Sequence, residues 1–385
     1  MRNDNKKSPL LWGLLLSYGD KNMDIITLSV PRKARIICIS DIHGCYSAFD
    51  ALLEKCGYDN GSDYLFILGD LAEKGRENIA VIRKAMELCQ SPNVICIKGN
   101  NDTMCVRMAF SDSKEKFLSR LDNRPFNCYI EMAQELGLAK EDFEKRFEES
   151  REKVNKAFEV ELSFMSSLPL AIETEEHIFI HAGIENRPDW QNTSERFALT
   201  EPWYFNKEHQ ADKIVVCGHY PTYNFEAANN TDLPIIDKDK KIICIDGGAT
   251  TKCAGQLNAF IINRSEEVYG YETVFEPLHP RKTVKRSVTD SRKPIYVNWE
   301  SHELTVMGKQ KDFLEVKINQ TGETGLIHEN RCGYWDEKLH GWTYLDAFLS
   351  VSAGESFAIA DETEEYFFGI AENGQVGFVP KSCFD

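Results

Sequence analysis

The sequence lacks a stretch of apolar residues long enough to cross a membrane. The apolar run over residues 10–18 is interrupted by Gly13 and is far shorter than the roughly 20 residues of a membrane helix. Basic residues precede this run, as they do in a secretory signal, but no convincing small-residue cleavage site follows it. We therefore expect no membrane association and interpret residues 1–30 as an N-terminal extension, in which Met23 could be the natural start. Export is the alternative.

The chain also has few basic residues for its content of acids. It carries 61 Asp and Glu against 45 Lys and Arg, a formal net charge of −16. Such a charge repels the phosphate backbone of nucleic acids, so we expect no nucleic-acid partner. The composition, 42% hydrophobic and 28% charged, is typical of a globular protein. A length of 385 residues predicts two or three domains.

Disulfide and redox motifs are missing as well, although there are twelve cysteines. None of them falls in a CxxC pair, and Cys38, Cys96, Cys217 and Cys244 each lie inside a short aliphatic run. A thiol in such a run behaves as a small buried hydrophobe. We expect reduced cysteines and a cytoplasmic location.

The first half of the chain alternates strand-like and helix-like segments. Buried-strand patterns at 36–40, 64–70 and 93–97 are separated by helical patterns, the first of which spaces Phe49, Leu52 and Cys56 along one face. This alternation predicts an α/β domain over residues 31–275, with a largely parallel sheet covered on both faces and polar chemistry at the carboxyl ends of its strands. Residues 111–165, rich in Lys, Glu and Leu, predict a helical insertion or cap.

The last third has a different character. Residues 276–295 are basic, contain proline and show no apolar period, as in a linker. Over 296–385 we expect an all-β region, in which Gly322 and Gly325 recur 52 residues later as Gly374 and Gly377. The repeat predicts two copies of a small all-β barrel, at about 280–332 and 333–385. The second copy resembles a Src-homology-3-like barrel, which implies a peptide ligand; packing against the first domain is the alternative.

Five short motifs follow one another along the α/β domain: SDIHG at 40–44, GDLAEKG at 69–75, GNND at 99–102, HAG at 181–183 and GHYPT at 218–222. Together they resemble the calcineurin-like metallophosphoesterase superfamily. The similarity is greatest to its branch of phosphoprotein phosphatases and bacterial diadenosine tetraphosphate hydrolases, and it covers roughly residues 35–263. The resemblance implies an α+β sandwich of mixed sheets flanked by helices, and a hydrolase of phosphate esters or anhydrides.

The same resemblance implies a site for two divalent metal ions, with manganese expected and iron, zinc or magnesium as alternatives. The residues that it assigns as ligands are Asp41 and His43 for the first ion, Asp70 as the bridge, and Asn100, His181 and His219 for the second ion. A water between two such ions loses a proton near neutral pH and attacks phosphorus in line.

Two positions depart from the pattern of this family. Lys74, with Arg76 two residues later, stands where the family has a phosphate-binding arginine, and lysine cannot hold two phosphate oxygens in one plane. Asn101 stands where the family has a proton-donating histidine, with Asp102 as its neighbouring acid. Asparagine cannot donate a proton to the leaving group, and loss of a general acid typically costs about 10²- to 10⁴-fold in rate. Phosphoanhydrides and aryl esters should therefore be better substrates than alkyl esters.

The sequence therefore favours a metal-dependent phosphohydrolase resembling protein phosphatases, acting on a phosphorylated protein. A dinucleotide polyphosphate hydrolase, acting on a nucleotide polyphosphate, is the first alternative. The alternative from another class is a catalytically weak phosphatase fold that serves as a scaffold and binds partners through its all-β region.

Overall fold

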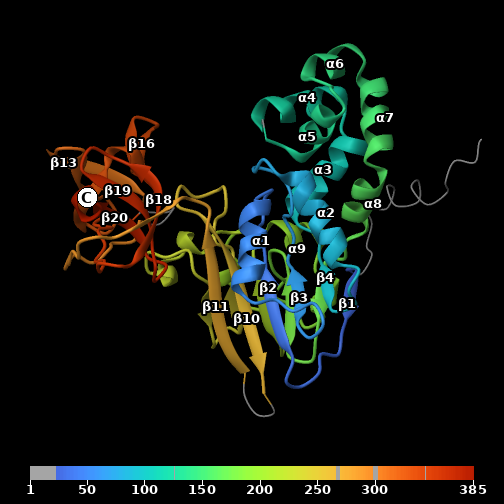
Figure 1. The fold of residues 1–385 in the computed structure, drawn as a ribbon, viewed down its shortest axis with the longest axis horizontal. Coiled ribbons are helices and arrows are strands. Elements are labelled where there is room, and N and C mark those ends of the chain that lie inside the picture. The colour runs from blue at the N-terminus through green and yellow to red at the C-terminus, as the bar shows by residue number, and fades with distance from the viewer. Residues whose placement is uncertain (1–22, 125, 266–268, 298–301, 343) are drawn as a thin grey trace, which may run out of the picture.

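The computed structural model describes residues 23–124, 126–265, 269–297, 302–342 and 344–385. Three parts are visible in Figure 1: a body with two β-sheets, a helical cap above one end of the body, and a β-rich C-terminal region at its side. None of the helices in these residues has the length and apolar character that a bilayer crossing requires.

The body contains two mixed sheets. One has the order β1-β5-β6-β7-β9-β8, with β1 (Ile25–Thr27), β5 (Ala171–Glu173), β6 (His177–Ile180), β7 (Ile214–Cys217), β9 (Ile242–Cys244) and β8 (Ile235–Asp237). The other has the order β11-β10-β2-β3-β4, with β11 (Tyr269–Pro277), β10 (Gln256–Arg264), β2 (Arg35–Ile39), β3 (Tyr64–Ile67) and β4 (Val94–Cys96). Strands β2, β3 and β4 are parallel, as the alternating pattern predicts, whereas β10 and β11 are antiparallel to their neighbours.

The two sheets pack face to face. Phe66 of β3 meets Phe179 of β6 edge to face, with their ring centroids 4.8 Å apart, in a core shared by both sheets. Helices α1 (Tyr46–Lys55) and α2 (Asn78–Leu88) cover the outer face of the five-stranded sheet. Burial of Phe49 and Leu52 on α1 follows the helical spacing of the sequence. The body is thus a sandwich. The five-stranded sheet has these helices on its outer face and the six-stranded sheet on its inner face.

The body begins earlier in the sequence than the pattern of residues predicts. Strand β1, within the residues interpreted as an extension, runs parallel to β5 with Ile25 opposite Ala171. Met23 is buried in the same core cluster as Leu170. Residues 1–22, with their apolar run, lie outside the described residues.

The cap is helical, as its composition indicates. It comprises α3 (Asn100–Phe110), α4 (Lys114–Asn123), α5 (Cys128–Glu135), α6 (Lys140–Lys145), α7 (Phe147–Ala157) and α8 (Glu159–Ser167). Phe117 lies at its centre and makes ring contacts with Tyr129, Phe143 and Phe147. Because α3 begins at the GNND motif, the cap is continuous with the metal-binding motifs below it. Helix α9 (Glu195–Thr200) packs on the other side of the body.

The C-terminal region forms two antiparallel sheets. The first, β15-β14-β13-β17-β16, contains β13 (Glu303–Gln310), β14 (Phe313–Ile318), β15 (Thr324–His328), β16 (Cys332–Trp335) and β17 (Lys338–Gly341). The second, β12-β18-β19-β20, contains β12 (Arg281–Thr283), β18 (Ser356–Glu362), β19 (Tyr366–Ala371) and β20 (Val376–Pro380). No closed barrel is found among the residues described.

The segment 276–295, expected to be a linker, belongs partly to these sheets. Its strand β12 pairs with β18, with Lys282 opposite Phe357, and Val284 is buried. The second sheet therefore takes its first strand from before the first sheet, so the two units are not consecutive halves of the region. Within them Gly322 and Gly374 occupy equivalent hairpin turns with φ of +78° and +85°, and Gly325 and Gly377 lie in the strands that follow.

The C-terminal region packs against the body. Tyr223 of the body shares a core cluster with Tyr344 and Phe348, and the backbone nitrogen of Val376 donates to the carbonyl of Asn230 at 2.9 Å. All twelve cysteines are free, as their positions in the sequence predict.

Candidate metal centre

The five motifs meet at one edge of the sandwich because each follows the carboxyl end of a strand. Asp41 follows β2, Asp70 follows β3, and Asn100 follows β4. His181 and His219 follow β6 and β7 of the facing sheet. Loops that are far apart in sequence thereby bring their polar side chains to the same place.

Two overlapping sets of side chains could each hold a metal ion. The first contains Asp41, His43 and Asp70, all buried, and the second contains Asp70, His181 and His219. In each set the candidate ligand atoms lie within 4.8 Å of one another. Carboxylate oxygens and imidazole nitrogens suit manganese, iron or zinc. Asp70 is the member common to both sets, so one carboxylate could contact two ions.

The backbone at these positions is held in an uncommon conformation. Asp41, His43, Asp70 and His219 have φ of +53°, +48°, +54° and +70°. Residues other than glycine rarely adopt this left-handed region, and such strain persists where the surrounding structure enforces it. The four side chains are directed into the site at the cost of backbone strain, which is typical of functional residues.

Glycine is required next to this centre. A Cβ at Gly99 would lie 2.2 Å from Oδ1 of Asp70, and a Cβ at Gly218 would lie 2.2 Å from Oδ2 of Asp41. Any other side chain would therefore displace a candidate ligand, which explains the glycine that begins both GNND and GHYPT.

The histidines are oriented by backbone carbonyls. His181 donates from Nδ1 to the carbonyl of Leu68 at 2.8 Å, which leaves the lone pair of its Nε2 toward the site. Nε2 lies 2.9 Å from Oδ1 of Asn100. His43 likewise places Nδ1 3.3 Å from the carbonyl of Ala72. This arrangement presents nitrogen lone pairs to a cation.

Lys74 also reaches this centre. Its Nζ lies 2.8 Å from Nε2 of His43, the ring nitrogen that faces the candidate ligands. The ammonium therefore offsets some of the negative charge of the two aspartates. Arg76, the other basic residue considered from the sequence, instead stacks on Phe126 of the cap, 4.3 Å from the ring centroid.

Electrostatics at the centre reflect two buried carboxylates in close contact. Burial and the neighbouring Asp70 raise the pKa of Asp41 to about 8. Burial opposes ionisation of Asp70 too, but His181, His43 and Lys74 hold the pKa of that carboxyl below its usual value. Oδ1 of Asp41 is buried and has no hydrogen-bond partner within the described chain. Burial lowers the pKa of His43 and His219 to about 3, so both imidazoles are neutral and able to ligate. These donors fit divalent cations.

Asn101 is directed at the shared carboxylate. Its Nδ2 donates to Oδ2 of Asp70 at 2.5 Å, and its backbone nitrogen donates to Oδ1 at 2.8 Å. Asp102 has a different set of partners from those the family pattern suggests. It accepts from the backbone nitrogens of Asp70, Leu71 and Gly99 at 2.8 to 2.9 Å, and so holds the loop that carries Asp70.

Two further residues lie near the centre: Arg124, which escaped the sequence analysis, and Glu73, which stands in the GDLAEKG motif without an assigned role. Arg124, between α4 and α5, donates from Nη1 to Oδ1 of Asn101 at 2.8 Å. Glu73 is fully buried and accepts from the backbone nitrogen of Cys128 at 3.1 Å. Burial raises the pKa of Glu73 to about 7. Glu73 belongs to the GDLAEKG motif, where its acid could be seen but its burial could not, whereas no spacing relates Arg124 to the motifs.

The family of the chain follows from its sequence. The model of the calcineurin-like phosphoesterases matches residues 34–245, more than half of the chain. The chain belongs to this family. Its body accordingly has the metallophosphoesterase α/β fold.

Curated relatives are named symmetrical bis(5'-nucleosyl)-tetraphosphatases. One from Aggregatibacter actinomycetemcomitans is 27% identical over 165 residues, which cover 42% of this chain and 48% of that protein. Another, from Buchnera aphidicola subsp. Acyrthosiphon pisum, is 37% identical over 92 residues, or 22% of this chain and 33% of that protein. The chain thus spans less than half the length of these relatives.

Solved structures of phosphatases are similar at lower identity. A cold-active protein-tyrosine phosphatase of a Shewanella species is 15% identical, with a TM-score of 0.40 and coverage of 66% of this chain and 82% of that chain. A protein serine/threonine phosphatase from Saccharomyces cerevisiae is 12% identical, with a TM-score of 0.41. The match covers 67% of this chain and 87% of that chain.

Proposed function

We propose that the protein is a two-metal phosphohydrolase that cleaves phosphoanhydrides, with nucleotide polyphosphates as its substrate class. The observation that carries the proposal is the pair of overlapping donor sets that share Asp70. Asp41, His43 and Asp70 would hold the first ion, and Asp70, Asn100, His181 and His219 the second. Divalent ions held there neutralise phosphate charge and lower the pKa of water toward 7.

The reaction is a simple hydrolysis. Water supplies a hydroxyl group to the attacked phosphorus, the bridging P–O bond breaks, and its oxygen leaves with the electron pair while a proton passes to solvent. When the leaving group is itself a phosphate, it departs as a stable anion and needs no proton. Asn101, which cannot donate a proton, therefore suits an anhydride better than an alkyl ester. Lys74, whose Nζ lies 2.8 Å from Nε2 of His43, would contact a phosphate oxygen as a point charge.

The substrate class is inferred from the leaving group and from the relatives. The names of the curated relatives support a dinucleoside polyphosphate more directly than a phosphoprotein, which the sequence analysis ranked first. The free cysteines support a reducing, cytoplasmic setting for the reaction. Manganese is the ion that we would supply first, because mixed carboxylate and imidazole ligands suit it.

A substrate comparison tests the proposal. The full chain, loaded with manganese, would be assayed with diadenosine tetraphosphate, nitrophenyl phosphate and a phosphoseryl peptide. We expect the tetraphosphate to give the highest kcat/KM and the phosphoseryl peptide the lowest. A phosphoseryl peptide ranking first would contradict our account of Asn101. No turnover of any substrate with metal shown to be bound would favour the scaffold alternative.

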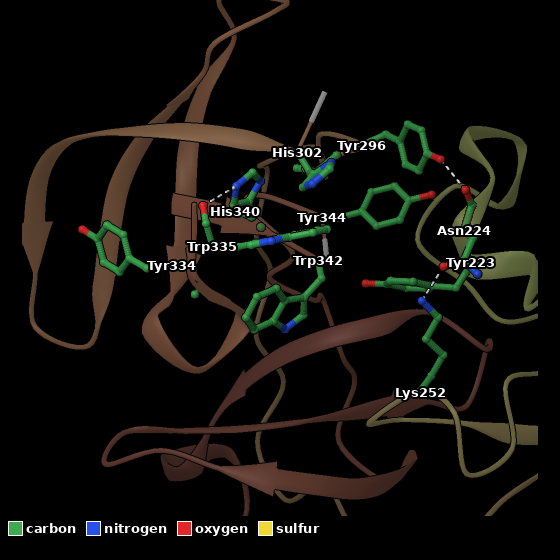
Figure 2. Close-up of a pocket in the computed structure, with 13 residues that line it drawn as sticks. Tyr223, Asn224, Lys252, Tyr296, His302, Tyr334, Trp335, His340, Trp342 and Tyr344 are labelled. Atoms are coloured by element: carbon green, nitrogen blue, oxygen red, sulfur yellow. Dashed lines mark hydrogen bonds between the residues drawn. The ribbon is translucent and has the colours of Figure 1, made fainter. Parts of the chain in front are cut away.

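A second candidate function is peptide binding, which an aromatic pocket between the body and the C-terminal region favours. Its volume is about 210 Å³, and its lining includes Tyr223, Lys252, Tyr296, Trp335, Trp342 and Tyr344. Figure 2 shows Tyr223 and Lys252 entering from the body and the tryptophans from the β-sheet opposite. Trp335 and Trp342 are 62% and 51% exposed, unusual for such large rings. Aromatic grooves of this kind suit an extended, proline-rich peptide, as the resemblance to Src-homology-3-like barrels also implies.

Tryptophan fluorescence would test the pocket. Titration of the full chain with a proline-rich peptide should change the emission, and Trp335→Ala should weaken binding about tenfold or more. Val160→Ala, at an exposed site on the cap, is the matched control. Equal affinity in Trp335→Ala and the parent would contradict peptide binding at this pocket.

A further inference from the structure

Helix α5 of the cap is hydrogen-bonded to the loop of the shared aspartate and to the start of α2. Glu73, in that loop, accepts from the backbone nitrogen of Cys128 at the start of α5. From α5 itself, Glu131 accepts from the backbone nitrogens of Asn78 and Ile79 at 2.9 and 3.0 Å, where α2 begins. The start of α5 is therefore held against the body by hydrogen bonds from both directions. The residue directly after α4 belongs to the same cap and lies four residues before the start of α5.

Arg124 occupies that position. Its own backbone is held on both sides, because its nitrogen donates to the carbonyl of Arg120 at 2.9 Å and its carbonyl accepts from Nδ2 of Asn127 at 2.8 Å. Its guanidinium donates to Oδ1 of Asn101, and within the described chain this is its single hydrogen bond. A guanidinium has five N–H donors, so most of this one remains available to a ligand.

The amide of Asn101 connects this arginine to Asp70. Its oxygen accepts from Arg124 and its nitrogen donates to the carboxylate, so the amide cannot rotate without losing both bonds. A histidine here would place an imidazolium beside a guanidinium whenever it was protonated, and the two like charges would repel each other. Asn101 and Arg124 are therefore compatible with each other, whereas a protonated histidine and Arg124 are not.

Two cationic side chains thus lie near the shared carboxylate, each next to a different neighbour of it. Lys74 lies beside His43 in the first donor set, and Arg124 reaches the site from the cap through Asn101. A phosphate monoester has one charged phosphoryl group and leaves behind a neutral alcohol. A polyphosphate has charged phosphoryl groups beyond the one that is attacked, and a planar guanidinium can bind two oxygens of such a group at once.

We propose that Arg124 binds the phosphoryl group next to the one attacked and thereby selects polyphosphates over phosphate monoesters. The inference rests on the proposed function, since it assigns a substrate-binding residue to the same site. It also supplies the forked phosphate contact that Lys74 cannot make. The cap, through this one residue, becomes part of the substrate site.

Binding of an uncleavable ligand tests the role of Arg124 independently of turnover. The ligand would be a methylene-bridged analogue of diadenosine tetraphosphate, titrated by calorimetry into the manganese-loaded full chain, with inorganic phosphate as the small comparator. We expect Arg124→Ala to lower the affinity for the analogue about tenfold or more and to change the affinity for inorganic phosphate less than twofold. Arg124→Lys should be intermediate, because it keeps the charge and loses the fork.

The control is Arg146→Ala, which removes another cap arginine, paired with Asp142 on the surface. It should leave both affinities unchanged. In turnover, Arg124→Ala should lower kcat/KM for the tetraphosphate about 10²-fold and that for nitrophenyl phosphate less than threefold.

The outcomes separate this inference from the proposed function. Equal analogue affinity in the parent and Arg124→Ala would overturn the role of Arg124 alone. Equal losses for the analogue and for inorganic phosphate would also overturn it, because they would indicate general damage to the site. A parent chain that binds the analogue through Arg124 but hydrolyses no anhydride would overturn the proposed reaction while supporting this binding role.

Discussion

Asn101 holds both oxygens of Asp70, with Nδ2 2.5 Å from Oδ2 and the backbone nitrogen 2.8 Å from Oδ1. Asp70 is the carboxylate that the two donor sets share. The asparagine therefore orients the central candidate ligand, a role that does not require a proton. Its presence at this position is compatible with an active centre.

Removing the amide should weaken metal binding. Asn101→Ala loses the side-chain bond that fixes Asp70, and loss of such a supporting partner typically costs about 10- to 100-fold in metal affinity. Calorimetric titration with manganese would measure the change. Asn123→Ala, whose amide bonds only within its own helix, is the control. Unchanged manganese affinity in Asn101→Ala would show that Asp70 is oriented without this bond.

Asp102 should matter for stability. Asp102→Asn replaces a carboxylate that accepts several backbone N–H groups, and its amide would point a donor at other donors. Charged hydrogen bonds contribute about 1.5–3 kcal/mol each, so we expect the free energy of unfolding to fall by about 2–3 kcal/mol. Denaturant unfolding measures it, with Asp122→Asn at an exposed position as the reference. A fall below about 0.5 kcal/mol, the range of ordinary surface changes, would contradict the role assigned to Asp102.

Glu73 predicts a pH dependence of stability. Its pKa is about 7 in the folded chain, above the ordinary value of 4.5, because burial penalises the charged carboxylate. The folded chain therefore favours the protonated form of Glu73. The resulting contribution to stability is complete below pH 4.5 and disappears as the pH rises through 7. Between these pH values the free energy of unfolding of the parent should fall by about 2–3 kcal/mol more than that of Glu73→Gln. Denaturant unfolding at pH 4.5 and pH 8, in the presence of a chelator, would compare the two chains. Parallel pH profiles would indicate that Glu73 does not titrate in this range.

Lys74 should compete with the first metal ion. Its ammonium lies 2.8 Å from Nε2 of His43, among the candidate ligands of that ion. Lys74→Met removes a positive charge from this place, and the affinity for a divalent cation should rise about tenfold. Affinity for inorganic phosphate should fall, since a phosphate contact is lost. Lys114→Met, on the cap surface, provides the comparison. A lower metal affinity in Lys74→Met would contradict this account.

Much of the fold was predictable because its signals are local. The aliphatic strands, the apolar face of α1 and the glycines at the hairpin turns each depend on neighbours a few residues away. The meeting of the motifs was also predictable, since the carboxyl ends of adjacent parallel strands lie at one edge. The pairing of β12 with β18 and of β1 with β5 was not predictable, because the paired strands are short and more than 70 residues apart in the sequence.

The site residues likewise include some that the sequence predicts and some that it does not. Asp41, His43, Asp70, His181 and His219 belong to motifs that the resemblance to the metallophosphoesterases identifies. Arg124 lies in a charged helical segment where arginines are common, and only the closure of the cap over the site brings it to Asn101. The role of Asp102 was also hidden, because its partners are backbone groups that no side-chain pattern reports.

The contact between the C-terminal region and the body bears on how the protein can be divided. Tyr223, four residues after His219, is buried partly by Tyr344 and Phe348. A chain shortened after β11 would leave this tyrosine and its neighbours uncovered, on the same loop that carries a candidate ligand. Removing the C-terminal region would therefore expose apolar side chains next to His219 and destabilise the loop that carries it.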